Sequence, residues 1–163
     1  MSLTIRPMAP TDRDTALELL AAQLEEHDIA TPREHMGAML DGILTRPGLG
    51  EVLLAYLEAE PVGVAYLAYI WTLEHGGRVV WLEELFVRPA YRERGVGQKL
   101  LNAVLEHARR VGCVAIDLEV ERSHGRAANL YARAGFRMLD RTRWTQILEL
   151  EAEAGGEDEA QRR

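Results

Sequence analysis

Arg92-Glu93-Arg94-Gly95-Val96-Gly97 separates an apolar run at positions 82–87 from an amphipathic segment at positions 98–111. A strand, a basic glycine-rich turn and a helix in this order can bind a phosphate-bearing ligand on backbone N–H groups. Gly95 and Gly97 lack a Cβ atom, so a pyrophosphate can approach the main chain closely, and the helix adds the positive end of its dipole. The stretch therefore predicts a phosphate-binding turn at the start of a helix.

The chain has 163 residues and a formal net charge of −7, with one cysteine. This length suffices for one domain with its own core. The negative charge disfavours a nucleic-acid partner and suits a cationic substrate. No apolar run approaches the ~20 residues that cross a bilayer. The N-terminus has no signal-peptide pattern, so we expect a cytoplasmic protein that does not bind membranes.

Hydrophobic periodicity and turn residues predict an alternating series of strands and helices. Strands are expected at positions 3–6, 51–58, 62–72, 78–88, 114–120, 136–139 and 143–150. Helices are expected at positions 12–27, from 32 to about 46, at 98–111 and at 125–134. We expect residues 1–150 to form one domain, and the acidic tail at 151–163 to be disordered.

The links between elements predict a mixed sheet. Short turns join the strands at 51–58, 62–72 and 78–88, which favours an antiparallel meander. From position 78 to position 120 the order is strand, helix, strand, and this crossover requires parallel pairing. The predicted class is therefore α/β with a mixed sheet. We also expect Trp71, Trp81 and Trp144 to pack on this sheet and His107 to be exposed on its helix.

The turn fits neither of two common phosphate motifs. Leu100 stands where the dinucleotide fingerprint needs its third glycine, and no Gly-Lys-Ser/Thr follows to make a P-loop. The remaining pattern, Arg-x-x-Gly-x-Gly, resembles the central motif of the GNAT family of acetyl-CoA-dependent N-acetyltransferases. The run from Asn129 to Phe136, Asn-Leu-Tyr-Ala-Arg-Ala-Gly-Phe, is similar to the second signature of that family. Glu83-Glu84-Leu85-Phe86-Val87 resembles the strand before the turn, with some similarity to spermidine/spermine acetyltransferases.

The resemblance implies a fold and a co-substrate. The GNAT fold has a central, mostly antiparallel sheet whose fourth and fifth strands are parallel and splayed, with about four flanking helices. The pantetheine arm of acetyl-CoA inserts between the splayed strands, and the resemblance implies no metal. The residues that it implies in acetyl-CoA binding are Leu85, Phe86 and Val87 along the arm, Arg92, Arg94, Gly95, Val96, Gly97 and Gln98 at the pyrophosphate, and Asn129 beside the arm.

The resemblance also suggests catalytic groups. The tyrosine of the second signature, Tyr131, would protonate the departing CoA thiolate, since a phenol and a thiol have comparable pKa values. His124 stands where many members have an asparagine, and it is expected near the cofactor or the acceptor. Glu26, at the end of the first helix, is expected at the acceptor pocket. The five histidines show no metal-ligand spacing along the chain.

Glu83 and Glu84 are candidates for binding and deprotonating an ammonium acceptor. Strand alternation places Glu83 on the face of Trp81 and Leu85, and Glu84 on the opposite face. A β-bulge of the kind found in the family would re-aim either carboxylate, so spacing does not choose between them. We favour Glu83 as a base that acts through water and Glu84 as a substrate ligand.

The expected function is transfer of an acetyl group from acetyl-CoA to the primary amine of a small cationic acceptor by direct attack. The resemblance also implies that a homodimer is possible. One alternative is a protein N-terminal or lysine acetyltransferase, and another is a non-catalytic acyl-CoA-binding module. Polyamines, aminoglycosides, amino acids and peptide amines all remain open as acceptors.

Overall fold

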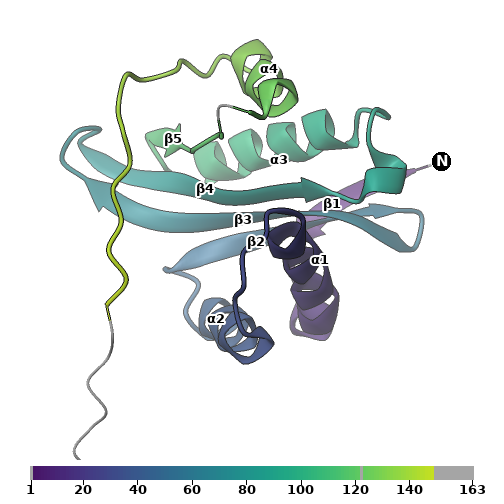
Figure 1. Cartoon of the computed structure of the whole chain (residues 1–163). Coiled ribbons are helices and arrows are strands. Elements are labelled where there is room, and N and C mark those ends of the chain that lie inside the picture. The colour runs from purple at the N-terminus through teal and green to yellow at the C-terminus, as the bar shows by residue number, and fades with distance from the viewer. Residues whose placement is uncertain (1, 122, 149–163) are drawn as a thin grey trace, which may run out of the picture.

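A five-stranded sheet with the strand order β1-β2-β3-β4-β5 forms the centre of the structure, a computed structural model that describes residues 2–121 and 123–148 (Figure 1). The strands β1 to β4 pair antiparallel with their neighbours, whereas β4 and β5 pair parallel. The predicted mixed sheet is therefore confirmed. The strands are β1 (Leu3–Pro7), β2 (Gly50–Leu57), β3 (Glu60–Thr72), β4 (Gly77–Val87) and β5 (Ala115–Asp117).

Helices cover both faces of the sheet. α1 (Arg13–Glu26) and α2 (Arg33–Thr45) lie on one face, and α3 (Val96–Arg110) and α4 (Gly125–Arg133) lie on the other (Figure 1). Two 3₁₀ turns, η1 (Pro10–Asp12) and η2 (Pro89–Tyr91), precede α1 and α3. None of the helices in the described part of the chain is both long and apolar enough to cross a membrane.

The two core clusters follow the predicted periodicity. On α3, Leu100, Leu101 and Val104 are fully buried against the sheet, which includes Val80 and Leu82 of β4. The core on the opposite face contains residues of α1 and α2 together with Val52, Leu54, Val64 and Phe86 of the sheet. The sheet thus lies between two apolar layers.

The two strands expected at 136–139 and 143–150 are wrong for the residues described, because 136–148 contains no strand. Met138 is 99% exposed and Trp144 is 90% exposed. Apolar residues alternate in this segment, but a strand also needs a partner for its backbone hydrogen bonds, and the adjacent β5 extends only from Ala115 to Asp117. Positions 149 and 150 and the predicted tail at 151–163 lie outside the described residues.

Ion pairs connect this C-terminal segment to the rest of the molecule. Arg141 pairs with Glu74 at 2.7 Å, and Arg143 pairs with Glu119 at 2.7 Å. These are exposed charge pairs, which stabilise a segment only weakly. The segment is therefore held by surface ion pairs and not by backbone hydrogen bonds to a neighbouring strand.

Two expectations about single side chains are also wrong. Trp71 and Trp144 are exposed rather than packed on the sheet. His107 is only 5% exposed, because its face of α3 meets β3, where the Tyr69 hydroxyl lies 2.7 Å from His107 Nε2. Burial, together with the charges of Arg110 and Arg78, lowers the pKa of His107.

Asp12 links β1, β2 and the start of α1. We expect protonation of its carboxylate to lower the free energy of unfolding in acid. Its carboxylate accepts hydrogen bonds from Arg6 at 2.6 and 3.0 Å, from the Tyr56 hydroxyl at 3.0 Å and from the Ala9 N–H at 2.8 Å. These bonds, that of Arg6 above all, hold the pKa of Asp12 well below its usual range. A depressed pKa stabilises the fold above the unfolded-state pKa of about 3.9, and this contribution is lost as the pH falls further towards the folded-state pKa.

Asp12→Asn should therefore lower the free energy of unfolding at pH 7 by about 1–3 kcal/mol. Its difference from the wild type should shrink below about pH 4, where the unfolded chain begins to bind the proton. Urea unfolding at pH 7 and pH 3 measures both effects. Asp14→Asn is the matched control, because the side chain of Asp14 is 91% exposed. An equal loss at both pH values would contradict the assignment.

Candidate active site

β4 and β5 separate soon after they begin to pair. The pairing joins Val79, Val80 and Trp81 of β4 to the three residues of β5, and the chain then leaves β5 at Asp117. Beyond Trp81, no strand pairs with this side of β4 within residues 2–121 and 123–148. The main-chain N–H and C=O groups of 82–87 that point to this side therefore have no strand partner among the described residues, and the Val87 carbonyl accepts a hydrogen bond from Arg92 Nε at 2.9 Å. The predicted parallel, splayed pair is thus present.

The glycine-rich turn has the backbone geometry of an anion-binding site. Gly95 caps α3 with φ = 77°, and Glu93 also has a positive φ of 63°. The first hydrogen bond of the helix runs from the Lys99 N–H to the Gly95 carbonyl at 3.1 Å. The N–H groups of the three preceding residues, 96–98, therefore have no acceptor within the helix, and they coincide with its positive dipole end. This arrangement suits a phosphate group.

The two glycines of the turn serve different purposes. Apart from Gly95 itself, its chain neighbours and the adjoining helix backbone, no atom of the described residues lies within 4 Å of a Cβ built on Gly95. Glycine is therefore favoured there by its left-handed backbone and not by lack of space. A Cβ on Gly97 would lie 3.8 Å from Val87 Cγ2 and 4.0 Å from Leu130 Cδ2. Gly97 therefore lies where β4, α3 and α4 come together, next to the open side of β4.

Arg92 and Glu26, expected respectively at the pyrophosphate and at the acceptor, are partners of each other. The Arg92 guanidinium donates to Glu26 at 2.5 Å and to the Val87 carbonyl at 2.9 Å, and this contact holds the pKa of Glu26 below its ordinary value. Arg92 thereby joins the end of α1 to the end of β4. Arg94 is 5.6 Å from the centroid of the Tyr91 ring.

A β-bulge in β4 changes the faces on which Glu83 and Glu84 lie. The register pairs Tyr66 with Glu84 but Leu67 with Leu82, so Glu83 is the extra residue. Leu82 and Leu85 accordingly both pack in the core under α3, although they are three residues apart. Plain alternation placed Leu85 on the same face as Trp81. This prediction is wrong, because alternation assumes a ladder without a bulge.

After the bulge, Glu84 lies on the α1 face with Phe86, opposite Leu85, so the expected bulge did re-aim Glu84 relative to Trp81. Its carboxylate accepts a hydrogen bond from Gln23 Nε2 of α1 at 2.8 Å. Glu84 is half-buried, and this burial raises its pKa, as does the nearby charge of Glu83. Glu83 itself is exposed. The two adjacent carboxylates thus differ strongly in environment.

Tyr131 lies on α4 and interacts electrostatically with Glu84. Its ring packs edge to face on Phe136, with the ring centroids 5.6 Å apart. Burial, and secondarily the charge of Glu84, raises the pKa of Tyr131 to about 12. The phenol is therefore protonated at neutral pH and can donate a proton. Asn129, two residues earlier, is exposed.

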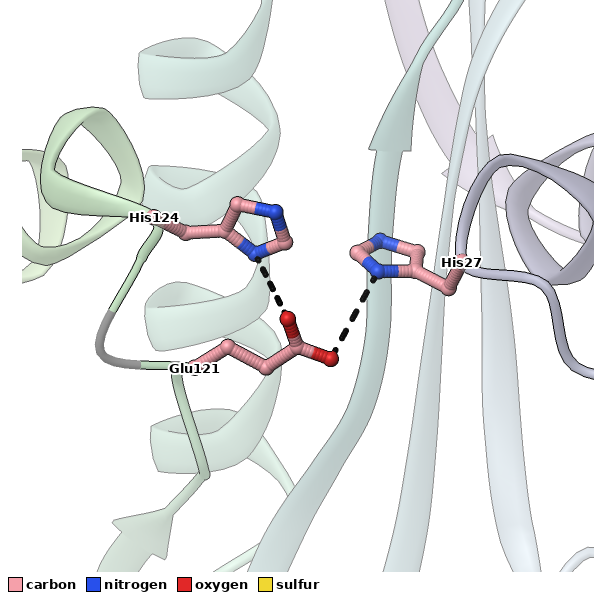
Figure 2. Close-up of side chains that lie close together, drawn as sticks. All are labelled: His27, Glu121 and His124. Carbon is pink, nitrogen blue, oxygen red and sulfur yellow. Dashed lines mark ion pairs between the residues drawn. The ribbon is translucent and has the colours of Figure 1, made fainter.

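The end of α1 faces the start of α4 across Glu121 (Figure 2). His124, the residue before α4, is exposed, and its Nδ1 lies 3.8 Å from Glu121 Oε2. His27, directly after α1, lies 4.0 Å from Glu121 Oε1 through its own Nδ1. The two imidazole rings are perpendicular, with centroids 5.1 Å apart.

The sequence prediction missed Gln23, His27 and Glu121. One signal was available, because Gln23 and His27 are four residues apart and share a face of α1. Their partners, however, lie in β4 and in the loop before α4, and no local pattern connects these segments.

Comparisons with known proteins agree with this geometry. Residues 15–136, which include the turn and Tyr131, match the family described as "Acetyltransferase (GNAT) family". A thialysine N-epsilon-acetyltransferase from Sus scrofa is 33% identical over 115 residues, which cover 69% of this chain but only 62% of that protein. A spermine/spermidine N(1)-acetyltransferase from Bacillus subtilis is 28% identical, with 83% of this chain and 88% of that protein covered.

The fold also matches a solved structure. An aminoglycoside N-acetyltransferase in complex with CoA superposes with a TM-score of 0.77, at 21% identity, over 90% of this chain and 95% of that chain. This likeness supports the architecture of the sheet and of its helical layers.

Proposed function

Because the chain belongs to the GNAT acetyltransferase family, we propose that it transfers the acetyl group of acetyl-CoA to the primary amine of a small cationic molecule. One observation carries this proposal. The open side of β4 is bordered by the glycine-rich turn at the start of α3 and by the interacting pair Glu84 and Tyr131. A donor with a pyrophosphate at one end and a thioester at the other fits such a site.

The donor would follow β4 from the turn towards the bulge. The N–H groups of Val96, Gly97 and Gln98, with that of Gly95, would bind the pyrophosphate. Backbone groups of Leu85, Phe86 and Val87 would pair with the pantetheine arm, because β5 does not occupy this side. Arg94 and Arg92 would add positive charge near the turn, and Asn129 would lie beside the arm. The neighbour described as a complex with CoA supports this choice of donor.

The reaction would be a direct transfer with both substrates bound. The free amine attacks the thioester carbonyl and forms the C–N bond, while a backbone N–H of Phe86 or Val87 stabilises the oxyanion. When the C–S bond breaks, Tyr131 donates its proton to the CoA thiolate, and the proton that the new amide nitrogen loses returns to the Tyr131 phenolate. A carboxylate takes the proton that the ammonium group must lose.

Burial favours Glu84 over Glu83 for that last task. The raised pKa of Glu84 makes it the stronger base, and its charge already interacts with Tyr131. Glu83, exposed at the bulge, would then attract the cationic acceptor. The sequence pattern favoured the reverse, with Glu83 acting through water and Glu84 as a ligand, and the two assignments predict different pH profiles.

The acceptor would reach these groups between the end of α1 and the start of α4. Glu26 and His124 border this approach, and the net charge of −7 favours a cation. Names of the relatives mention spermine, spermidine and thialysine, which supports a small amine. The homodimer that the resemblance implies stays a prediction.

A panel of amines assayed by CoA release tests the function. With acetyl-CoA as donor, we expect kcat/KM for at least one polyamine or lysine analogue to exceed that for any peptide amine by about tenfold or more. Turnover of peptides alone would favour a protein acetyltransferase. Binding of CoA without turnover of any amine would favour the non-catalytic module.

A further inference from the structure

His27, Glu121 and His124 form a group of potential metal ligands, and the proposed acetyl transfer does not require them to act together. One ligand atom from each of the three lies within 4.8 Å of the other two. The three side chains converge from two separate parts of the chain, the end of α1 and the loop between β5 and α4 (Figure 2). His27 is half-buried, whereas the other two are exposed.

We propose that these three residues bind a divalent transition metal of the Zn²⁺ class. Two imidazole nitrogens and one carboxylate oxygen are a ligand set that such ions prefer. Bonds of about 2.0–2.2 Å in tetrahedral geometry place ligand atoms about 3.3 Å apart. Glu121 Oε2 lies 3.8 Å from His124 Nδ1 and Glu121 Oε1 lies 4.0 Å from His27 Nδ1, and one ligand atom of each residue lies within 4.8 Å of the other two. Rotation of the exposed Glu121 and His124 side chains would have to bring these atoms closer by up to about 1.5 Å. Water would complete the coordination.

The same distances argue against a group held together by hydrogen bonds alone. An N–H···O bond measures about 2.7–3.2 Å, so neither imidazole is within hydrogen-bond reach of Glu121. His75 provides the contrast, because its Nε2 lies 3.0 Å from Asp117 Oδ2, an ordinary hydrogen-bond distance. Among the described residues, His75 and Asp117 are not part of a group of three potential ligands.

The surroundings of the group also favour a cation. Glu26, the last residue of α1, interacts with the charges of both histidines, and Glu84 interacts with the charge of His27. Arg92 compensates Glu26 only in part, because both side chains remain partly exposed. Two further carboxylates therefore lower the electrostatic cost of placing a positive ion here.

A bound ion would connect α1 to the loop before α4. These segments lie on opposite sides of the approach to β4, and within the described residues no salt bridge other than that of His27 with Glu121 joins them. Metal binding to the folded state alone raises its stability by RT ln(1 + [M]/Kd), where [M] is the concentration of free metal. The ion would thus hold the end of α1 next to the loop before α4. It would also make His124 unavailable for contact with the acceptor.

Metal binding to the full chain, without a histidine tag and after treatment with EDTA, tests the proposal without any acetylation assay. Calorimetric titration with Zn²⁺ should show one site, and Co²⁺ should give the visible absorption of a tetrahedral complex. His27→Ala, Glu121→Gln and His124→Ala should each raise the Kd of Zn²⁺ at least about tenfold, which corresponds to about 1.4 kcal/mol. The same variants should lose the rise in Tm that Zn²⁺ causes in the wild type.

His35→Ala and His75→Ala are the controls, because one histidine is exposed on α2 and the other belongs to the pair with Asp117. Both should retain the Kd of the wild type. Unchanged Tm values of the metal-free variants verify that they fold. The proposal is overturned if Zn²⁺ does not bind, if His27→Ala binds it as tightly as the wild type, or if His75→Ala abolishes binding. Because no amine or acetyl-CoA is present, a negative result here leaves the acetyltransferase proposal unaffected.

Discussion

Tyr131→Phe is expected to lower kcat by about 10²–10³-fold and to change the Kd of CoA by less than about threefold. The substitution removes only the hydroxyl that would protonate the CoA thiolate, while the ring keeps its edge-to-face contact with Phe136. The pKa of Tyr131 is raised to about 12, so the wild-type phenol is protonated across the usual assay range. Steady-state kinetics with the best amine of the panel, together with calorimetric titration of CoA, measures both quantities.

Tyr69→Phe provides the matched control for this experiment. It also removes a hydroxyl of a half-buried tyrosine, one that contacts His107 at 2.7 Å on the far part of α3. Its kcat should remain that of the wild type, even if its stability falls. A Tyr131→Phe enzyme that keeps full kcat would show that another group, or water, protonates the thiolate.

Glu84→Gln is expected to lower kcat/KM by about 10²-fold and to remove the acidic limb of the pH profile. A general base works only when ionised, so wild-type activity should fall as the pH decreases through the pKa of Glu84. Burial raises that pKa, and the limb should lie above the ordinary glutamate value of about 4.3. The measurement is kcat/KM against pH for the wild type and for the variant.

Glu83→Gln distinguishes the roles of the two carboxylates. If Glu84 is the base, this variant should mainly raise KM for the cationic amine and should keep the acidic limb. Loss of the limb in Glu83→Gln, with the limb retained in Glu84→Gln, would instead support the assignment that the sequence pattern favoured. Gln23→Ala adds a further check, because the Gln23 hydrogen bond lowers the pKa of Glu84, and its removal should move the limb to higher pH.

Sequence patterns predicted most of the secondary structure, because the relevant signals are local. The apolar positions of α3 repeat at helical spacing, and its start is marked by two glycines within three residues. The crossover from β4 through α3 to β5 made the parallel pair predictable from chain order alone. The same reasoning failed after Phe136, since alternation indicates a suitable strand but does not supply a partner for it.

The candidate site was predictable where a motif occupies consecutive residues. The turn from Arg92 to Gly97 and the helix that carries Tyr131 are both continuous, and the structure places them on either side of the open β4 edge. The partners of Arg92 and Glu84 were not predictable, because each comes from α1, more than 60 positions away in the chain. Spacing along the sequence carries no information about such contacts.

The sequence by itself therefore determined the glycine-rich turn before α3, the helices around it and the mixed sheet, because backbone freedom and periodicity act over a few neighbouring residues. Only the tertiary structure decided three features of the site: the bulge that places Glu84 on the α1 face, the pairing of Arg92 with Glu26, and the convergence of His27, Glu121 and His124. The bulge depends on the pairing of β3 with β4, and the other two features depend on how the end of α1 lies against the segment after β4 and the loop before α4. Burial and electrostatic partners arise from that packing, and they shift the pKa values of side chains that look alike in the sequence.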